Sequence, residues 1–218
     1  QRRAGDPHMT EDTEIDVEQL RTELDHIKDA MGIRERYGAA TSMWLLFGVA
    51  VPVASALSQY VYMERLAGWY HAIIWAVVLG GAYAVWFAVS DDADRLEFRT
   101  DGKPNLFVQF GLVYFTIFPI QAIVAAFLPE LGYVEEALLV QSVIVVLVGL
   151  AYGMLGSSLA AYYVRRRDRA VFYVGTAWMI ALGVAIPYVG FLETWPHAAF
   201  GGLYFVYALA TYAVLTRT

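Results

Sequence analysis

Long apolar stretches alternate with short polar segments along most of the chain. Six stretches are about 20 residues long or more, the length that an α-helix needs to cross a hydrocarbon core of about 30 Å. The sequence therefore predicts an all-α, multi-pass membrane protein whose residues 37–218 form a bundle of six transmembrane helices. The predicted spans are residues 38–63, 69–90, 106–128, 137–164, 170–192 and 198–216.

A polar segment, residues 9–36, precedes the first span and has a different pattern. Its apolar residues recur at alternating spacings of three and four, as in a coiled-coil seam. Its other faces are mostly acidic, which is unfavourable against an anionic membrane surface. We expect a cytoplasmic acidic helix, amphipathic or coiled-coil, that makes the protein a homo-oligomer; the alternative is a helix lying on the membrane or against the bundle. The seam residues are Val17, Leu20, Leu24, Ile27 and Met31.

Residues 1–8 come before the first methionine, Met9. The dipeptide His8-Met9 is what a common cloning site leaves in front of a start codon, so we interpret residues 1–8 as an expression scar. They are left out of the functional argument.

Positive charges collect on one side of the predicted spans. A single arginine, Arg65, flanks them on the other side. Because cytoplasmic loops are enriched in lysine and arginine, both termini are predicted to lie in the cytoplasm, with the protein in the cell membrane. The eleven charges on the predicted cytoplasmic side are Lys28, Arg34, Arg36, Arg95, Arg99, Lys103, Arg165, Arg166, Arg167, Arg169 and Arg217.

The overall composition narrows the classes of function. Only two lysines stand against thirteen arginines and 21 acidic residues, a bias typical of proteins from salt-loving, halophilic archaea. The chain has no cysteine, which excludes disulfides, thiolate metal sites and a cysteine nucleophile. A hydrophobic content of 59% with a net charge of -6 makes membrane lipids the expected partners and excludes a basic nucleic-acid-binding domain.

Two parts of the chain resemble each other. Residues 41–52 read TSMWLLFGVAVP and residues 176–187 read TAWMIALGVAIP, and each segment is followed by a Trp-x-His-Ala sequence that begins at Trp69 or Trp195. Pro119 lies about midway between the prolines that end the two segments. We expect an internal repeat of two-helix hairpins, present in two or three copies, each with an outward helix and a return helix.

Neutral polar residues within the spans are the candidates for a solute path. Gln59, Gln121 and Gln141 offer amide groups, and Pro52, Pro119 and Pro187 each free a backbone carbonyl one helical turn earlier. Hydrogen bonding between helices is the alternative role for the glutamines, and kinked packing is the alternative for the prolines. Ionisable residues are absent from the middle of the spans, which excludes a proton-coupled pump or a voltage sensor.

Four residues near the outer boundary are candidates for a pH-sensing or metal site: His71, His197, Glu64 and Glu193. Histidines beside interfacial tryptophans need no such role, and zinc-ligand spacing is not met within either segment. No motif identifies a cofactor or a catalytic residue.

Three functions fit these features. The first is a passive channel or facilitator for a small solute, based on the repeat, the neutral polar groups and the recurring prolines. The second is an oligomeric membrane scaffold or regulatory subunit without transport activity. The third, an integral-membrane enzyme acting on lipid or quinone, is the least favoured.

Overall fold

The computed structural model describes residues 41–89, 104–128, 130–162 and 164–217 of the chain, together with four residues nearer the amino terminus. The chain divides into two compact units, Gln1–Arg34 and Glu35–Thr218. The four described residues of the first unit are helical and exposed; they are Leu20, Glu23, Leu24 and Ile27. Three of the five predicted seam residues are among them, whereas Val17 and Met31 lie outside the described residues.

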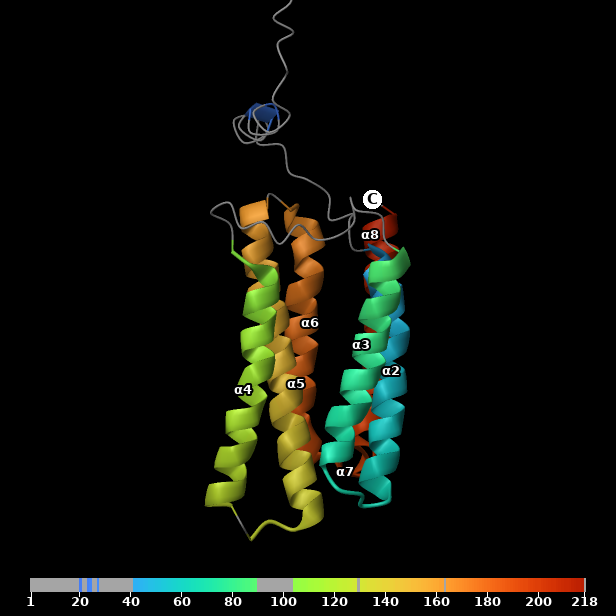
Figure 1. Ribbon diagram of the computed structural model, residues 1–218, viewed down its shortest axis with the longest axis vertical. Helices are drawn as coiled ribbons and strands as arrows, with labels where there is room; N and C mark the ends of the chain where they lie inside the picture. The colour runs from blue at the N-terminus through green and yellow to red at the C-terminus, as the bar shows by residue number, and fades with distance from the viewer. Residues whose placement is uncertain are drawn as a thin grey trace, which may run out of the picture. The chain divides into compact units, whose positions relative to one another are not determined.

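The described part of the second unit contains seven α-helices and two short 3₁₀ segments and no sheet (Figure 1). This confirms the all-α prediction. The α-helices are α2 (Thr41–Met63), α3 (Trp69–Val89), α4 (Leu106–Phe127), α5 (Tyr133–Ser158), α6 (Arg166–Ala185), α7 (Gly190–Thr194) and α8 (Pro196–Thr216), and the 3₁₀ segments are η1 (Leu159–Tyr162) and η2 (Ile186–Tyr188).

Five of these helices are long and apolar enough to cross a membrane: α2, α3, α5, α6 and α8. Their length and hydropathy agree with the prediction of a multi-pass membrane protein. The sixth predicted span corresponds to α4, a helix of 22 residues whose qualifying apolar part, Gly111–Val124, is shorter. Because α4 packs along α5, we retain it as a predicted span.

The boundaries of the fifth span differ from the prediction. Residues 170–192 were expected to be one helix, but α6 begins at Arg166, ends at Ala185 and continues only as the 3₁₀ turn η2. The proline at 187 lies in that turn, so it marks the end of a helix instead of a kink within one. The sequence pattern also missed α7, a single short helix that leads into α8.

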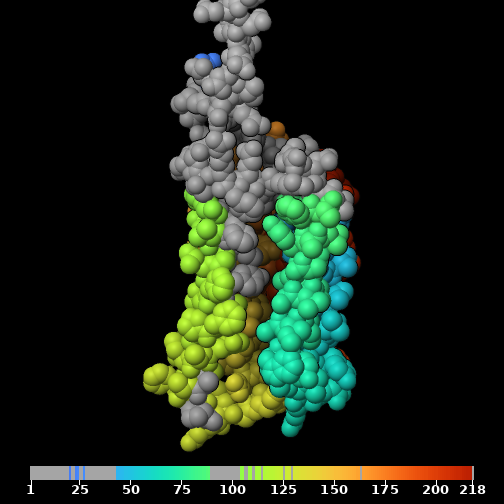
Figure 2. Space-filling view, viewed as in Figure 1, coloured from blue at the N-terminus to red at the C-terminus, as the bar shows by residue number. Residues whose placement is uncertain are grey.

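The six long helices associate as two groups of three. In one group α2 packs against both α3 and α8, and in the other α5 packs against both α4 and α6. Contacts between the groups are sparser; α8 meets α5 and α6, and Trp44 on α2 also meets rings of α5 and α6. Figure 2 shows α3 and α4 as separate ridges on one face, with α5 visible between them.

The packing shows which of the expected two-helix hairpins form. The pairs α2–α3 and α4–α5 do pack as hairpins, but α6 and α8 contact each other little, and their main partners are α5 and α2. The glycine that the two similar segments share lies at a close helix–helix contact in both of them. A Cβ atom at Gly48 would lie 3.0 Å from Cβ of Ala208 on α8, and one at Gly183 would lie 2.8 Å from the carbonyl oxygen of Ser142 on α5.

Close helix packing also joins α5 to α6. The sequence places Gly149, Gly153 and Gly156 on one face of α5, and a Cβ atom at any of them would crowd α6 at a distance of 3.0 or 3.1 Å. Small residues let transmembrane helices approach closely, because lipid provides no hydrophobic drive for their association. The α5–α6 pair is therefore held by backbone proximity and van der Waals contact.

Candidate functional site

A line of buried polar side chains follows the inward face of α8. His197, Tyr204, Tyr207 and Thr211 recur at intervals of three to seven residues, and each is less than 10% exposed. At a rise of 1.5 Å per residue, this α8 polar line extends for about 21 Å of a hydrocarbon core of about 30 Å. Polar groups buried in a membrane are costly unless they are hydrogen-bonded, so they are usually present for packing or function.

One end of the α8 polar line contains a pair of stacked histidines. The rings of His71 on α3 and His197 on α8 have centroids 4.9 Å apart and an interplanar angle of 27°. The ring of Tyr62 on α2 meets His197 edge-on at 6.0 Å. The structure thus brings together two of the predicted rim residues, at the end of the bundle that carries α7 (Figure 1).

Gln59 fixes the start of α8. Its Oε1 atom accepts hydrogen bonds from the backbone N–H groups of His197 and Ala198, both at 3.1 Å, and its Nε2 atom donates to the carbonyl oxygen of Thr194 at 3.0 Å. The first N–H groups of a helix have no partner inside the helix, so a side chain from α2 supplies one here. Its amide therefore makes interhelical hydrogen bonds, the alternative role considered above.

Several polar atoms near this end make no hydrogen bond within the part of the chain that the structure describes. They include Oγ of Ser55 and Ser58 on α2 and Nδ1 of His71 and His197. Ser55 is 1% exposed, Ser58 is 0% exposed and His197 is 6% exposed. Buried polar atoms are normally paired, so each of these requires an explanation.

Farther along α8, tyrosine hydroxyls bridge the two helix groups. The hydroxyls of Tyr152 on α5 and Tyr204 on α8 lie 2.7 Å apart, and the Tyr207 hydroxyl donates to the carbonyl oxygen of Val171 on α6 at 2.9 Å. Gly175 on α6 makes room for them, since a Cβ atom there would lie 2.5 Å from the Tyr207 hydroxyl oxygen.

Aromatic rings fill the space around these tyrosines. The ring of Trp44 packs edge-on against Phe172 and Tyr207, both at 5.6 Å, and against Tyr152 at 6.2 Å. Trp178 adds contacts to Phe200 and Tyr207. The α8 polar line is thus enclosed by rings in this conformation.

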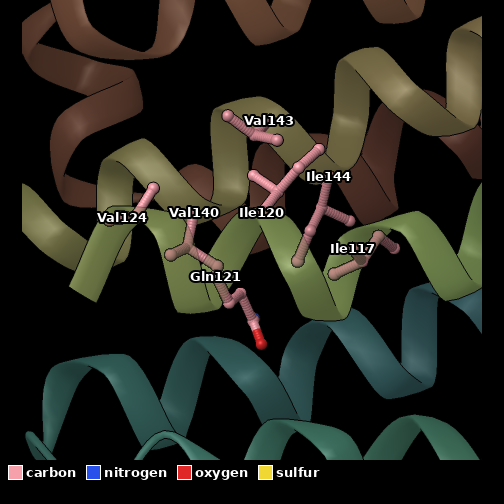
Figure 3. Close-up of a pocket in the computed structure, with 7 residues that line it drawn as sticks. All are labelled: Ile117, Ile120, Gln121, Val124, Val140, Val143 and Ile144. Carbon is pink, nitrogen blue, oxygen red and sulfur yellow. The ribbon is translucent and has the colours of Figure 1, made fainter. Parts of the chain in front are cut away.

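The other two glutamines have different surroundings. Gln141 is buried on α5. Gln121 on α4 is exposed and borders a crevice of about 10 Å³, roughly the space of one water molecule, and Figure 3 shows its amide extending away from the apolar side chains of that crevice. The other lining residues are Ile117, Ile120, Val124, Val140, Val143 and Ile144.

The three prolines do not share one environment. Pro52 and Pro119 lie inside α2 and α4, whereas Pro187 lies in η2. Pro119 and Pro187 are exposed, and Pro52 is partly buried. A Cβ atom at Gly201 would lie 3.2 Å from Cα of Pro52, which indicates close α2–α8 packing at this proline.

The two acidic rim residues named from the sequence lie at the protein surface. Glu64 and Glu193 are exposed, and the backbone oxygen of Glu193 accepts a hydrogen bond from the Tyr62 hydroxyl at 2.8 Å. Among the described residues, no three His, Asp or Glu side chains are grouped to hold a metal ion.

Sequence reasoning did not single out the α8 polar line. The helical spacing of Tyr204, Tyr207 and Thr211 is visible in the sequence and places them on one helix face. It did not distinguish them from the many other residues of an aromatic-rich span. Asp168, in the first turn of α6, is also buried, at 2% exposed. The sequence did not indicate this, because the residue stands among the arginines of residues 165–169.

The chain matches no protein-family model, and comparisons with curated proteins and with solved structures found no similar protein.

Proposed function

We propose that this membrane protein is a passive facilitator for small, neutral, hydrogen-bonding solutes. The observation that carries the proposal is the α8 polar line, in which His197, Tyr204, Tyr207 and Thr211 are buried one after another through most of the predicted membrane thickness. Such groups can replace the hydrogen bonds that a solute loses when it leaves water.

The charge distribution favours passive movement of a neutral solute. Beyond their first four residues, the six long helices contain no Asp, Glu, Lys or Arg. Proton relays and ion-coupled carriers normally depend on ionisable groups within the membrane. The lining offered to a solute consists of hydroxyls and imidazoles instead.

The aromatic contacts correspond to a closed state in this proposal. Rings of Trp44, Tyr152, Phe172 and Tyr207 pack against one another across the two helix groups. Contacts between the groups are sparser than those within them. A small separation of the groups would therefore expose the α8 polar line to a solute. The facilitator would then alternate between closed and open packing without a driving ion.

The proposal includes an orientation. The concentration of arginine and lysine on one side favours cytoplasmic termini and an extracytoplasmic α7 end. Solute would therefore enter from outside beside His71 and His197, and Gln59 would support the entrance through its hydrogen bonds to the start of α8.

The test is solute flux in liposomes that contain the purified protein. Thr211→Val keeps the shape of the side chain and removes a buried hydroxyl, so it should reduce flux several-fold. Thr216→Val on the same helix is the control, because Thr216 is exposed and donates to the carbonyl of Tyr212, one turn earlier. Accumulation of a solute driven by a proton gradient would contradict the proposal, as would equal flux in both variants.

A second candidate function is an oligomeric scaffold. The observation in its favour is the exposure of Leu20, Leu24 and Ile27, which are about half exposed in the single chain. Apolar side chains on one helix face gain stability by packing against a second copy. Homo-oligomerisation is compatible with transport, so an oligomer that shows no flux for any small solute would favour the scaffold.

A further inference from the structure

The unpaired polar atoms at the α7 end share one place in the fold. Ser55 and Ser58 lie on α2, four residues and one residue before Gln59, and His197 lies at the start of α8, where Gln59 binds its backbone. His71 reaches the same place from α3 by stacking on His197. We define these four residues as the serine–histidine cluster.

The two serines behave differently from the threonines in this protein. Thr116, Thr176 and Thr194 each donate to the carbonyl one turn earlier, at 2.7–3.1 Å. Ser55 and Ser58 make no such bond within the described chain, although neither is exposed by more than 1%. Leaving a buried hydroxyl unpaired costs about 1–3 kcal/mol, so a partner other than the described side chains is needed.

We infer that bound water molecules occupy the serine–histidine cluster, and that this cluster selects neutral, water-sized molecules that both donate and accept hydrogen bonds. Buried waters typically pair with polar groups that lack a protein partner. A serine hydroxyl both donates and accepts, and a neutral imidazole nitrogen does one or the other, so a lining of this kind matches water or ammonia.

Close helix packing sets the size limit. A Cβ atom at Gly201 on α8 would lie 2.6 Å from Cβ of Ser55, so α2 and α8 are nearly in backbone contact beside the cluster. A polyol or an amide with several heavy atoms would have to separate these two helices. A water-sized molecule would require a much smaller displacement of the helices.

The stacked geometry argues against a metal ion as the occupant. The lone pair of an imidazole nitrogen lies in the plane of its ring, and the planes of His71 and His197 are inclined by only 27° with centroids 4.9 Å apart. Lone pairs in nearly parallel, stacked rings do not converge on one ion. No third His, Asp or Glu completes a metal site among the described residues.

Radiolytic hydroxyl-radical labelling of the purified protein tests the binding. Radicals formed from a trapped water label the side chain beside it even when bulk solvent has no access. We expect strong labelling of His197 and little labelling of Met179, a more oxidisable residue that is 0% exposed and packs against Gly149 in the α5–α6 contact. Ser55→Ala combined with Ser58→Ala should abolish the labelling of His197, whereas Ser157→Ala, an exposed serine at the end of α5, should not.

Flux measurements test the selectivity, which rests on the proposed function. Osmotic shrinkage of protein-containing liposomes reports water, an internal pH dye with an ammonium gradient reports ammonia, and glycerol and urea are the larger probes. We expect water or ammonia to pass and the larger probes to be excluded. Labelling of His197 without flux would refute the proposed function and leave the water site intact.

Weak labelling of His197, equal to that of Met179, would overturn the inference even if a solute passes. Glycerol flux that depends on Thr211 would support the facilitator and refute the size limit. If His197 is still labelled in the double serine variant, the two serines do not hold the water, and that part of the inference is wrong.

Discussion

Gln59 on α2 holds the backbone of His197 at the start of α8, through a hydrogen bond of 3.1 Å between Oε1 and the backbone nitrogen. This one amide joins α2 to α8 and binds the backbone of a residue whose ring belongs to the histidine stack. Structure and proposed entrance therefore depend on the same residue.

Gln59→Leu should destabilise the protein. The substitution leaves the N–H groups of His197 and Ala198 and the carbonyl of Thr194 without their partner, at a cost of about 3 kcal/mol. Thermal unfolding in detergent, followed by circular dichroism, measures the effect. Gln121→Leu is the control because Gln121 is exposed, and similar losses in both variants would contradict the capping role.

Two glycines should respond to alanine in opposite ways. Gly183→Ala places a methyl group 2.7 Å from Val146 and 2.8 Å from a backbone oxygen on α5, so we expect a loss of about 1–3 kcal/mol. Gly80→Ala on α3 meets no atom within 4 Å and should gain up to about 1 kcal/mol from helix propensity. Unfolding in denaturant compares them, and a stable Gly183→Ala protein would show that α5 and α6 can separate without cost.

Single cysteines can map the orientation directly, since the chain has none of its own. Arg167→Cys should react with a membrane-impermeant thiol reagent only from the cytoplasmic side, and Glu193→Cys only from outside. Both residues are exposed. Labelling of both from the same side of intact cells would refute the six-span arrangement.

Leu24→Asp should shift the protein toward the monomer while leaving the long helices folded. Leu24 is 51% exposed and lies in the predicted seam, where a charge is unfavourable between two packed helices. Light scattering measures the protein mass in detergent. Glu23→Gln, at the neighbouring exposed position, should keep the oligomer, and an unchanged mass in Leu24→Asp would show that the seam does not mediate association.

The helices could be predicted from sequence because apolar length is a local property. Helix α2 ends at Met63 as predicted, and α3 begins at Trp69 as predicted. The pairing of helices could not be predicted in the same way, because the apolar faces of α2 and α6 read alike while one packs on α8 and the other on α5. Chain order suggested that α6 and α8 form a hairpin, and tertiary packing gave each of them a different main partner.

The candidate site was only partly predictable for a related reason. His71 and His197 share a Trp-x-His sequence, which indicated that they belong together, and they are stacked. Gln59 was singled out for its amide, but its backbone partners on α8 have no sequence signature. Tyr152 and Tyr204 meet only because α5 and α8 come together in the fold.

The pairing of α2 with α8 has a consequence for biosynthesis. During translation α2 is made well before α8, and Gln59 on α2 has no access to its partners Thr194, His197 and Ala198 until that part of the chain has been made. The face of α2 that carries Gln59 must meanwhile be shielded by lipid, by the insertion machinery or by α3. Docking of α8 against α2 is therefore a late step relative to the synthesis of α2, and a ribosome that stops before Pro196 would leave a polar helix face for membrane quality control to recognise.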